Sequence, residues 1–210
     1  MNKKIIFFEI FIILILSTYT ITAKEREVWA LNGAVVYFTP LGELSNRFKP
    51  TTTLTVGFTQ WYNPKFSMEV RLIAAWYNQN SDKLTYKDLD MKLEILGVNF
   101  NILYSLNLKE LCPYIIGGVG AYHWENQRAE LLVDKENVQT TILEHKRDEM
   151  SWGFNVGFGL KYRLISSIFL DINTRWEVIL AELWPDSLLQ MKNVLPIQMY
   201  SVNVGFRYFF

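Results

Sequence analysis

Charged side chains recur at alternate positions inside segments that are otherwise apolar or small. Carboxylates and guanidinium groups can pair with one another, hold ions or move protons, and a buried charge is costly unless it is paired. We therefore expect these residues to form one network of ion pairs, with asparagines filling the remaining hydrogen bonds; a gated path for solutes is the alternative. The charged residues are Glu69, Arg71, Lys161, Arg163, Asp171, Arg175, Glu177 and Arg207, and the asparagines are Asn99, Asn101, Asn155, Asn173 and Asn203.

Neither nucleophilic catalysis nor metal chemistry is indicated. A nucleophile needs an adjacent base that a third group orients, and no Ser-His-acid arrangement is apparent around His123 or His145. We interpret His123 as a polar residue of the interior and His145 as a solvated loop residue. Two histidines far apart make a weak zinc site, and the single Cys112 excludes an intramolecular disulfide. With 21 basic and 21 acidic residues the chain has no basic excess for nucleic acid. We expect no enzyme activity, cofactor or metal.

The elements that position these residues are strands, because the dominant hydrophobic period beyond residue 24 is two. In the segment 150–163, Trp152 and five further apolar residues alternate with serine, glycine, asparagine and basic residues. A soluble core would leave long charged side chains on the second face, whereas small and polar residues suit a cramped interior. We expect eight strands, at residues 28–38, 51–62, 66–77, 92–104, 113–125, 150–163, 168–180 and 197–210.

The connections between these strands alternate in length. "NPK" and "ISS" are short and the link 105–112 is of middling length, whereas the four connections near 39–50, 78–91, 126–149 and 181–196 are long. Transmembrane barrels have brief periplasmic turns and longer extracellular loops. The pattern predicts an all-β fold: an eight-stranded antiparallel up-and-down transmembrane β-barrel.

Aromatic residues recur in pairs 8 or 10 residues apart, so that each pair shares one face of a strand. Such a separation spans roughly 20–25 Å along a tilted barrel, the height of the apolar band that aromatic girdles border. A soluble, lipocalin-like barrel is the alternative fold, but it has no reason to keep this distance. The expected girdle consists of Trp29 and Tyr37, Phe66 and Trp76, Tyr114 and Trp124, Trp152 and Tyr162, and Tyr200 and Phe210.

The N-terminus has the composition of a secretory signal peptide. "MNKK" is positively charged, "IIFFEIFIILIL" is apolar and "STYTITA" ends in a small residue. We expect residues 1–23 to be a signal peptide and residues 24–210 to be the barrel domain. A transmembrane anchor is the alternative, although the apolar run is shorter than the roughly 20 residues of a spanning helix.

The segments "PYIIGGVGAYHW", "WGFNVGFGLKYRL" and "IFLDINTRWE", with the ending "VNVGFRYFF", resemble the small outer-membrane β-barrel proteins. That superfamily includes the transmembrane part of outer membrane protein A, outer membrane protein X and the opacity proteins. The resemblance implies a bacterial outer-membrane location, contact with outer-membrane lipids, and reading of the last strand by the barrel-assembly machinery. The signal residues would be Val204, Phe206, Tyr208 and Phe210.

The resemblance leaves function open, because the fold carries several roles. We expect a structural or surface-interaction protein with four long extracellular loops over a polar, plugged lumen. A narrow pore or transporter for a small or hydrophobic solute is the alternative, and a lipid-modifying enzyme would need the Ser-His-acid cluster that is not apparent. The loop 126–149 is the candidate site for an extracellular partner if its flanks, "AELLV" and "QTTILE", extend the neighbouring strands as a hairpin with an exposed edge, although the sequence favours a plain solvated loop. A charged, solvated loop is the competing interpretation. The loop 181–196 is expected to hold a short helix from Pro185, with Trp184 near lipid headgroups.

Overall fold

The computed structural model describes residues 28–83, 90–106, 110–135, 138–142, 144–183 and 193–210. The signal peptide and the helix expected from Pro185 lie outside these residues. No helix in the described part of the chain is long and apolar enough to cross a membrane. The elements are β1 (Val28–Pro40), α2 (Leu44–Arg47), β2 (Thr51–Trp61), β3 (Phe66–Asn78), β4 (Met91–Ser105), β5 (Leu111–Arg128), β6 (Leu131–Lys135), β7 (Val138–Ile142), β8 (His145–Ile165), β9 (Ile168–Ile179) and β10 (Ile197–Phe209).

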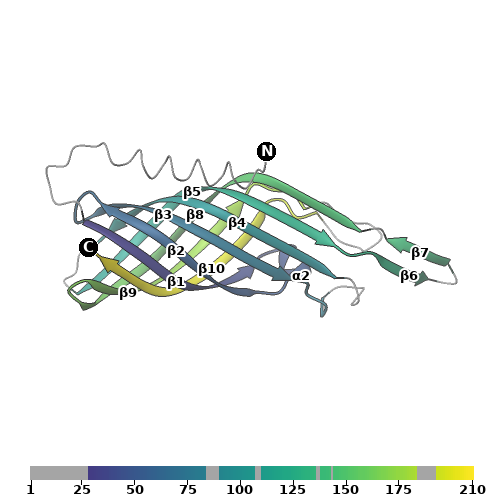
Figure 1. Cartoon of the computed structure of the whole chain (residues 1–210), viewed down its shortest axis with the longest axis horizontal. Helices are drawn as coiled ribbons and strands as arrows, with labels where there is room; N and C mark the ends of the chain where they lie inside the picture. The colour runs from purple at the N-terminus through teal and green to yellow at the C-terminus, as the bar shows by residue number, and fades with distance from the viewer. Residues whose placement is uncertain (1–27, 84–89, 107–109, 136–137, 143, 184–192) are drawn as a thin grey trace.

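Eight of these strands close into a barrel in the order β1-β10-β9-β8-β5-β4-β3-β2 (Figure 1). Every neighbouring pair is antiparallel, and β10 closes the barrel on β1, with Val204 opposite Val35. Closure leaves no strand edge along the barrel wall, which a hydrocarbon environment requires. The predicted fold class is therefore confirmed, and each predicted strand overlaps an observed one with ends that differ by at most five residues.

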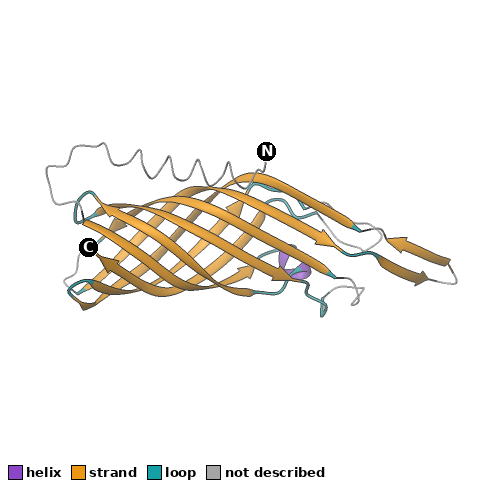
Figure 2. Cartoon of the chain, viewed as in Figure 1, coloured by secondary structure: helices purple, strands orange, loops and turns teal. Residues whose placement is uncertain are grey.

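Short and long connections gather at opposite ends of the barrel (Figure 2). Two short turns, residues 62–65 and 166–167, lie at the end that also holds the C-terminus. We call this the inner end, since short turns face the periplasm. At the outer end β5 and β8 stay paired as far as Arg128 opposite His145, and β6 pairs with β7 beyond them. The predicted hairpin extension is thus present, and it is the longest projection of the molecule in Figure 1.

The outer wall of the barrel carries a continuous belt of exposed apolar side chains. Leu54 and Trp152, for example, expose 70% and 71% of their surfaces. So much exposed apolar surface is untenable in water and fits a lipid environment. Most of the predicted girdle lies on this wall; these residues are Trp29, Tyr37, Phe66, Trp76, Trp152, Tyr162, Tyr200 and Phe210.

The prediction for β5 was wrong in its facing direction. Tyr114 and Trp124 are 3% and 0% exposed and lie inside the barrel, not in the girdle. The reason is steric: Gly118 lies on the same face, and a Cβ there would overlap the carbonyl oxygen of Phe100 on β4. The crowded, glycine-containing face must therefore turn inward, and it takes Tyr114 and Trp124 with it. His123, which was expected inside, consequently faces the membrane side.

Candidate functional site: the barrel lumen

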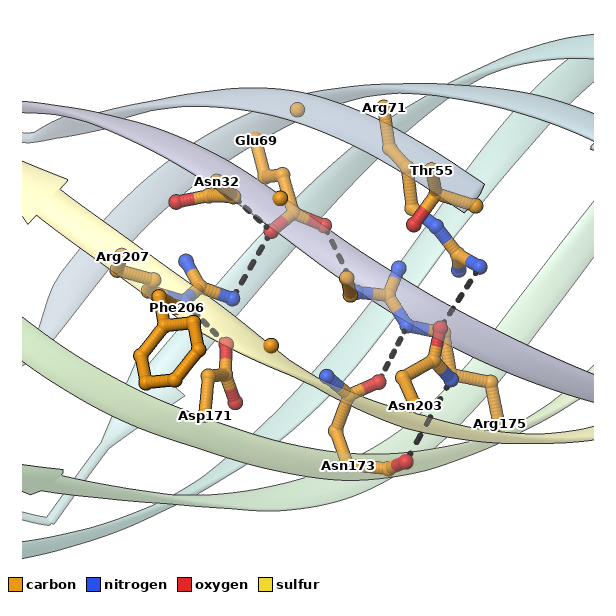
Figure 3. A pocket seen from close by; sticks show the side chains of 14 residues that line it. Asn32, Thr55, Glu69, Arg71, Asp171, Asn173, Arg175, Asn203, Phe206 and Arg207 are labelled. Carbon is orange, nitrogen blue, oxygen red and sulfur yellow. Dashed lines mark hydrogen bonds and ion pairs between the residues drawn. The ribbon is translucent and has the colours of Figure 1, made fainter. Parts of the chain in front are cut away.

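Glu69 is the centre of the predicted charge network. It lies on the inward face of β3, where it is 3% exposed. One carboxylate oxygen accepts from Arg175 Nη2 at 2.9 Å and from Asn101 Nδ2 at 3.2 Å. The other accepts from Arg207 Nη2 at 2.9 Å and Asn32 Nδ2 at 3.2 Å. Four donors from β1, β4, β9 and β10 therefore converge on one carboxylate of β3. Figure 3 shows three of these donor residues, Asn32, Arg175 and Arg207, around Glu69.

A second carboxylate, Asp171, belongs to the same layer of charged residues as Glu69, on the side toward the inner end of the barrel. It pairs with Arg207 Nε, and its other oxygen accepts the Tyr114 hydroxyl at 2.6 Å. Arg207 also donates to Thr59 Oγ1 at 3.0 Å. Arg207 is thus shared between Asp171 and Glu69, and its guanidinium joins β3, β9 and β10 as a planar, multidentate donor.

Arg71 forms a further ion pair, with Glu177. It lies one inward position further from the inner end than Glu69. Its Nη1 lies 3.4 Å from Glu177 Oε1, and its Nη2 donates to Asn203 Oδ1 at 3.0 Å. Ser201 donates to the same Glu177 oxygen at 3.3 Å. Glu177 is 0% exposed, so this pair depends on its protein partners rather than on water.

Among the described cations of this charged layer, Lys161 is the one with no carboxylate oxygen within 4.0 Å. Its Nζ donates to Ser105 Oγ at 3.0 Å and lies 5.0 Å and 5.1 Å from the ring centroids of Trp61 and Tyr114. Aromatic faces stabilise a desolvated cation. The layer therefore holds three acids and four bases, which leaves one positive charge in excess; the acids are Glu69, Asp171 and Glu177, and the bases are Arg71, Lys161, Arg175 and Arg207.

The inner mouth of the lumen is covered by aromatic rings. Phe209 lies 4.7 Å from both Trp61 and Phe169, measured between ring centroids. Arg163 was predicted in the lumen network, but it is exposed, and its guanidinium lies 5.3 Å from the Phe169 ring. That prediction is corrected: β8 has reached the barrel rim at Arg163, where the register with β9 shifts between Arg163 and Ile165.

The outer half of the lumen is apolar, which corrects the expectation of a polar interior throughout. On β3 the inward residues after Arg71 are Ile73, Ala75 and Tyr77, and all three are buried. The connection containing α2 adds Leu44 and Phe48 to the same cluster. The buried residues of this apolar cluster are Val36, Phe38, Leu44, Phe48, Ile73, Ala75, Tyr77, Met91, Leu93, Ile95, Tyr122, Trp124, Ile179, Ala181, Leu183, Val194, Ile197 and Met199.

A cavity of about 20 Å³ remains inside the charged layer, next to Arg71, Arg175 and Arg207 (Figure 3). This is room for a single water molecule. Asn32 Oδ1 and Arg175 Nη1 are buried without a hydrogen-bond partner, and both residues line the cavity. One bound water with polar partners is what such a space accommodates.

Sequence reasoning grouped most of the charged side chains correctly but missed several of their partners. Asn32, Thr59 and Tyr114 contribute hydrogen bonds to the network, and Trp61 covers Lys161. Asn101, Asn155, Asn173 and Asn203 take part as expected, whereas the buried Asn99 makes none of the hydrogen bonds described above for this network. The signal for Asn32 and Thr59 was available, because each occupies an inward position of its strand at the level of Glu69 and Arg207.

The ribbon formed by β5 and β8 beyond the outer girdle carries paired charges on its surface. Lys146 Nζ lies 2.7 Å from Glu125 Oε1, and this hydrogen bond lowers the pKa of Glu125 below its ordinary value. Arg147 Nη2 lies 2.6 Å from Glu149, and its guanidinium is 5.6 Å from the Trp124 ring. His123 faces outward opposite Leu96 and Met150, and the acid nearest to it along the same face of β5 is Glu125, which Lys146 engages.

Comparison with known proteins identifies the fold. No protein-family model matches the sequence, and no curated protein matches it. Solved structures do match. The major outer membrane protein of Thermus thermophilus has a TM-score of 0.59 and 9% identity, covering 89% of this chain and 100% of its own. OprG of Pseudomonas aeruginosa has a TM-score of 0.54 and 13% identity, with 87% and 95% covered. The Neisserial surface protein A has a TM-score of 0.50 and 12% identity, with 90% and 100% covered.

The fold is that of the small outer-membrane β-barrels. The exposed apolar belt and its aromatic borders agree with this fold, and together they place the protein in a bacterial outer membrane as an integral barrel. Val204, Phe206, Tyr208 and Phe210 all face outward on the last strand. Their reading by the assembly machinery stays a prediction.

Proposed function

We propose that this outer-membrane barrel has a structural or surface-interaction role, and that its interactions are made by the parts outside the membrane. The observation that supports the proposal is the arrangement of side chains inside the barrel. Aromatic rings cover the inner mouth, ion pairs occupy the next layer, and apolar side chains fill the outer half. An eight-stranded barrel is narrow enough for side chains to fill it completely.

Each layer opposes the passage of water and solutes for its own reason. The cavity of about 20 Å³ is too small for a solute. The ion pairs anchor side chains from several strands, so opening the layer would separate buried charges such as Arg175 and Glu69. An apolar constriction also excludes water by dewetting. These features support a closed barrel over a narrow pore or transporter.

The surface that would serve an interaction is the outer ribbon, residues 126–149, which includes the outer ends of β5 and β8. Residues of β8 from His145 pair with β5, whereas β9 begins to pair with β8 only at Gly153 opposite Ile179. Along this stretch the described residues include no strand on the β9 side, although Arg147 contacts the Glu182 carbonyl. A strand edge of this kind can accept an extended partner segment.

Single-channel recording tests the closed lumen. The mature chain, residues 24–210, is refolded into detergent and then inserted in planar bilayers, with the gel-mobility difference between boiled and unboiled samples as the control for folding. We expect a folded barrel that gives no steady conductance steps. Steady steps would refute the closed lumen and favour the pore or transporter.

A truncation series tests the outer ribbon. Replacing residues 129–144 with a two-residue turn should leave the barrel folded and abolish attachment of expressing cells to surfaces or to other cells. The matched control shortens the connection 79–90 instead, and it should retain attachment. Equal attachment by both variants and the full chain would contradict the role of the ribbon.

A further inference from the structure

The membrane-facing wall has a gap at Gly33 on β1. Its cross-strand neighbours are Phe206 on β10 and Val56 on β2, both with exposed side chains. A Cβ placed on Gly33 would meet no atom of the described residues within 4 Å. The missing side chain therefore leaves a depression in a wall that is otherwise covered by large apolar residues.

The depression is part of a groove of about 700 Å³. Its lining comes from three adjacent barrel strands, β2, β1 and β10, and from the end of β8 and the start of β9, which flank the turn 166–167. Apart from Asn32 and Gly33, every lining residue is apolar or aromatic; these are Leu31, Val56, Leu164, Ile165, Ile168, Phe206 and Tyr208.

The groove lies in the inner half of the apolar belt. Ile165 and Ile168 flank the turn 166–167 at the inner end, and Ile168 is in register with Tyr208. Tyr208 precedes the girdle residue Phe210 on the same face. This level corresponds to the inner leaflet of the outer membrane.

We propose that this groove binds one acyl chain of an inner-leaflet phospholipid. Apart from Asn32 and the Tyr208 hydroxyl, the lining side chains offer water no hydrogen bonds, and an unfilled groove would forfeit dispersion contacts along its surface. Hydrocarbon chains are the material at this depth, and a flexible chain follows a concave surface that the convex wall of a second barrel cannot enter. An acyl chain in the groove touches protein on several sides, whereas a chain against the plain wall touches it on one.

Native mass spectrometry with a matched pair of glycine variants tests the proposal. Gly33→Leu fills the floor of the groove. Gly117→Leu is the control, because Gly117 also faces outward, between Ile102 and Val156, and a Cβ there has only the Asn155 carbonyl at 3.9 Å. Each barrel is reconstituted in vesicles of palmitoyl-oleoyl phosphatidylethanolamine with added lipopolysaccharide, extracted, and stripped with increasing detergent.

We expect the unaltered barrel and Gly117→Leu to retain one phosphatidylethanolamine molecule, and Gly33→Leu to retain it about tenfold less. The proposal is overturned by equal retention in all three barrels or by loss of all lipid from the unaltered barrel. Retention of lipopolysaccharide in place of phospholipid would also overturn it. So would a dimer of the unaltered barrel that Gly33→Leu abolishes, since the occupant would then be a second copy.

Discussion

Replacing Glu69 with glutamine tests whether the lumen network holds the barrel together. The carboxylate accepts four hydrogen bonds, two of them from arginines at 2.9 Å. The amide of Glu69→Gln is neutral, and the excess positive charge of the layer rises from one to two. Removing one partner of a buried ion pair costs about 3–5 kcal/mol. We expect the free energy of unfolding to fall by that amount.

Urea unfolding in lipid vesicles, followed by tryptophan fluorescence and by gel mobility, measures this free energy. Glu94→Gln is the matched control, because Glu94 is an exposed carboxylate on β4, and surface substitutions change stability by about 0.5 kcal/mol or less. The double variant Glu69→Gln/Arg175→Gln removes both charges of one pair, and it should lose less stability than the two single variants together. A loss below about 1 kcal/mol in Glu69→Gln would refute the reasoning.

Three further predictions concern the lumen, the direction of β5 and the ribbon. Asp171→Ala should lower the unfolding temperature by roughly 6–12 °C without creating conductance, because the other layers stay in place; a large new conductance in planar bilayers would favour a gate. Gly118→Ala should prevent or strongly slow refolding in a gel-mobility assay, whereas Gly117→Ala, at the adjacent outward-facing position, should refold normally. Equal refolding of the two variants would contradict the assignment of the Gly118 face of β5 to the barrel interior. Lys146→Gln should raise the lowered pKa of the Glu125 carboxyl toward its ordinary value in an NMR titration, and an unchanged pKa would count against the hydrogen bond between them.

The three-layer interior of the barrel is the main structural finding, and the order of the layers can be followed along single strands. The inward residues of β10 run from Ile197 and Met199 at the outer end, through Asn203 and Arg207, to Phe209 at the inner end. Those of β9 run in the opposite chain direction and give the same order in space. The average composition of the second face predicts a uniformly polar interior, because the average hides the change from apolar to charged residues along each strand.

The alternation of residue types along the strands is enough to predict the barrel wall, the order of its strands and the charges inside it from the sequence alone. Side chains of a strand point to opposite sides with a period of two, so the pattern in residues such as Trp152 and Phe158 marks a wall between lipid and interior. Connection lengths then set the order and direction of the strands. Charged residues on the small-residue face must be buried and therefore paired. The sequence alone thus predicts that Glu69, Asp171 and Arg207 belong to one network.

What only the tertiary structure decided depends on contacts between strands far apart in the chain. β5 carries large residues on both faces, and its direction is set by Gly118 against Phe100 of β4. Which arginine meets which carboxylate follows from register and barrel closure, since Arg207 and Glu69 are 138 residues apart. The groove at Gly33 likewise forms only where β1, β2 and β10 lie next to the adjoining ends of β8 and β9. Local alternation specifies which side of a strand is inside, but the partners of each inward side chain are fixed only when the barrel closes.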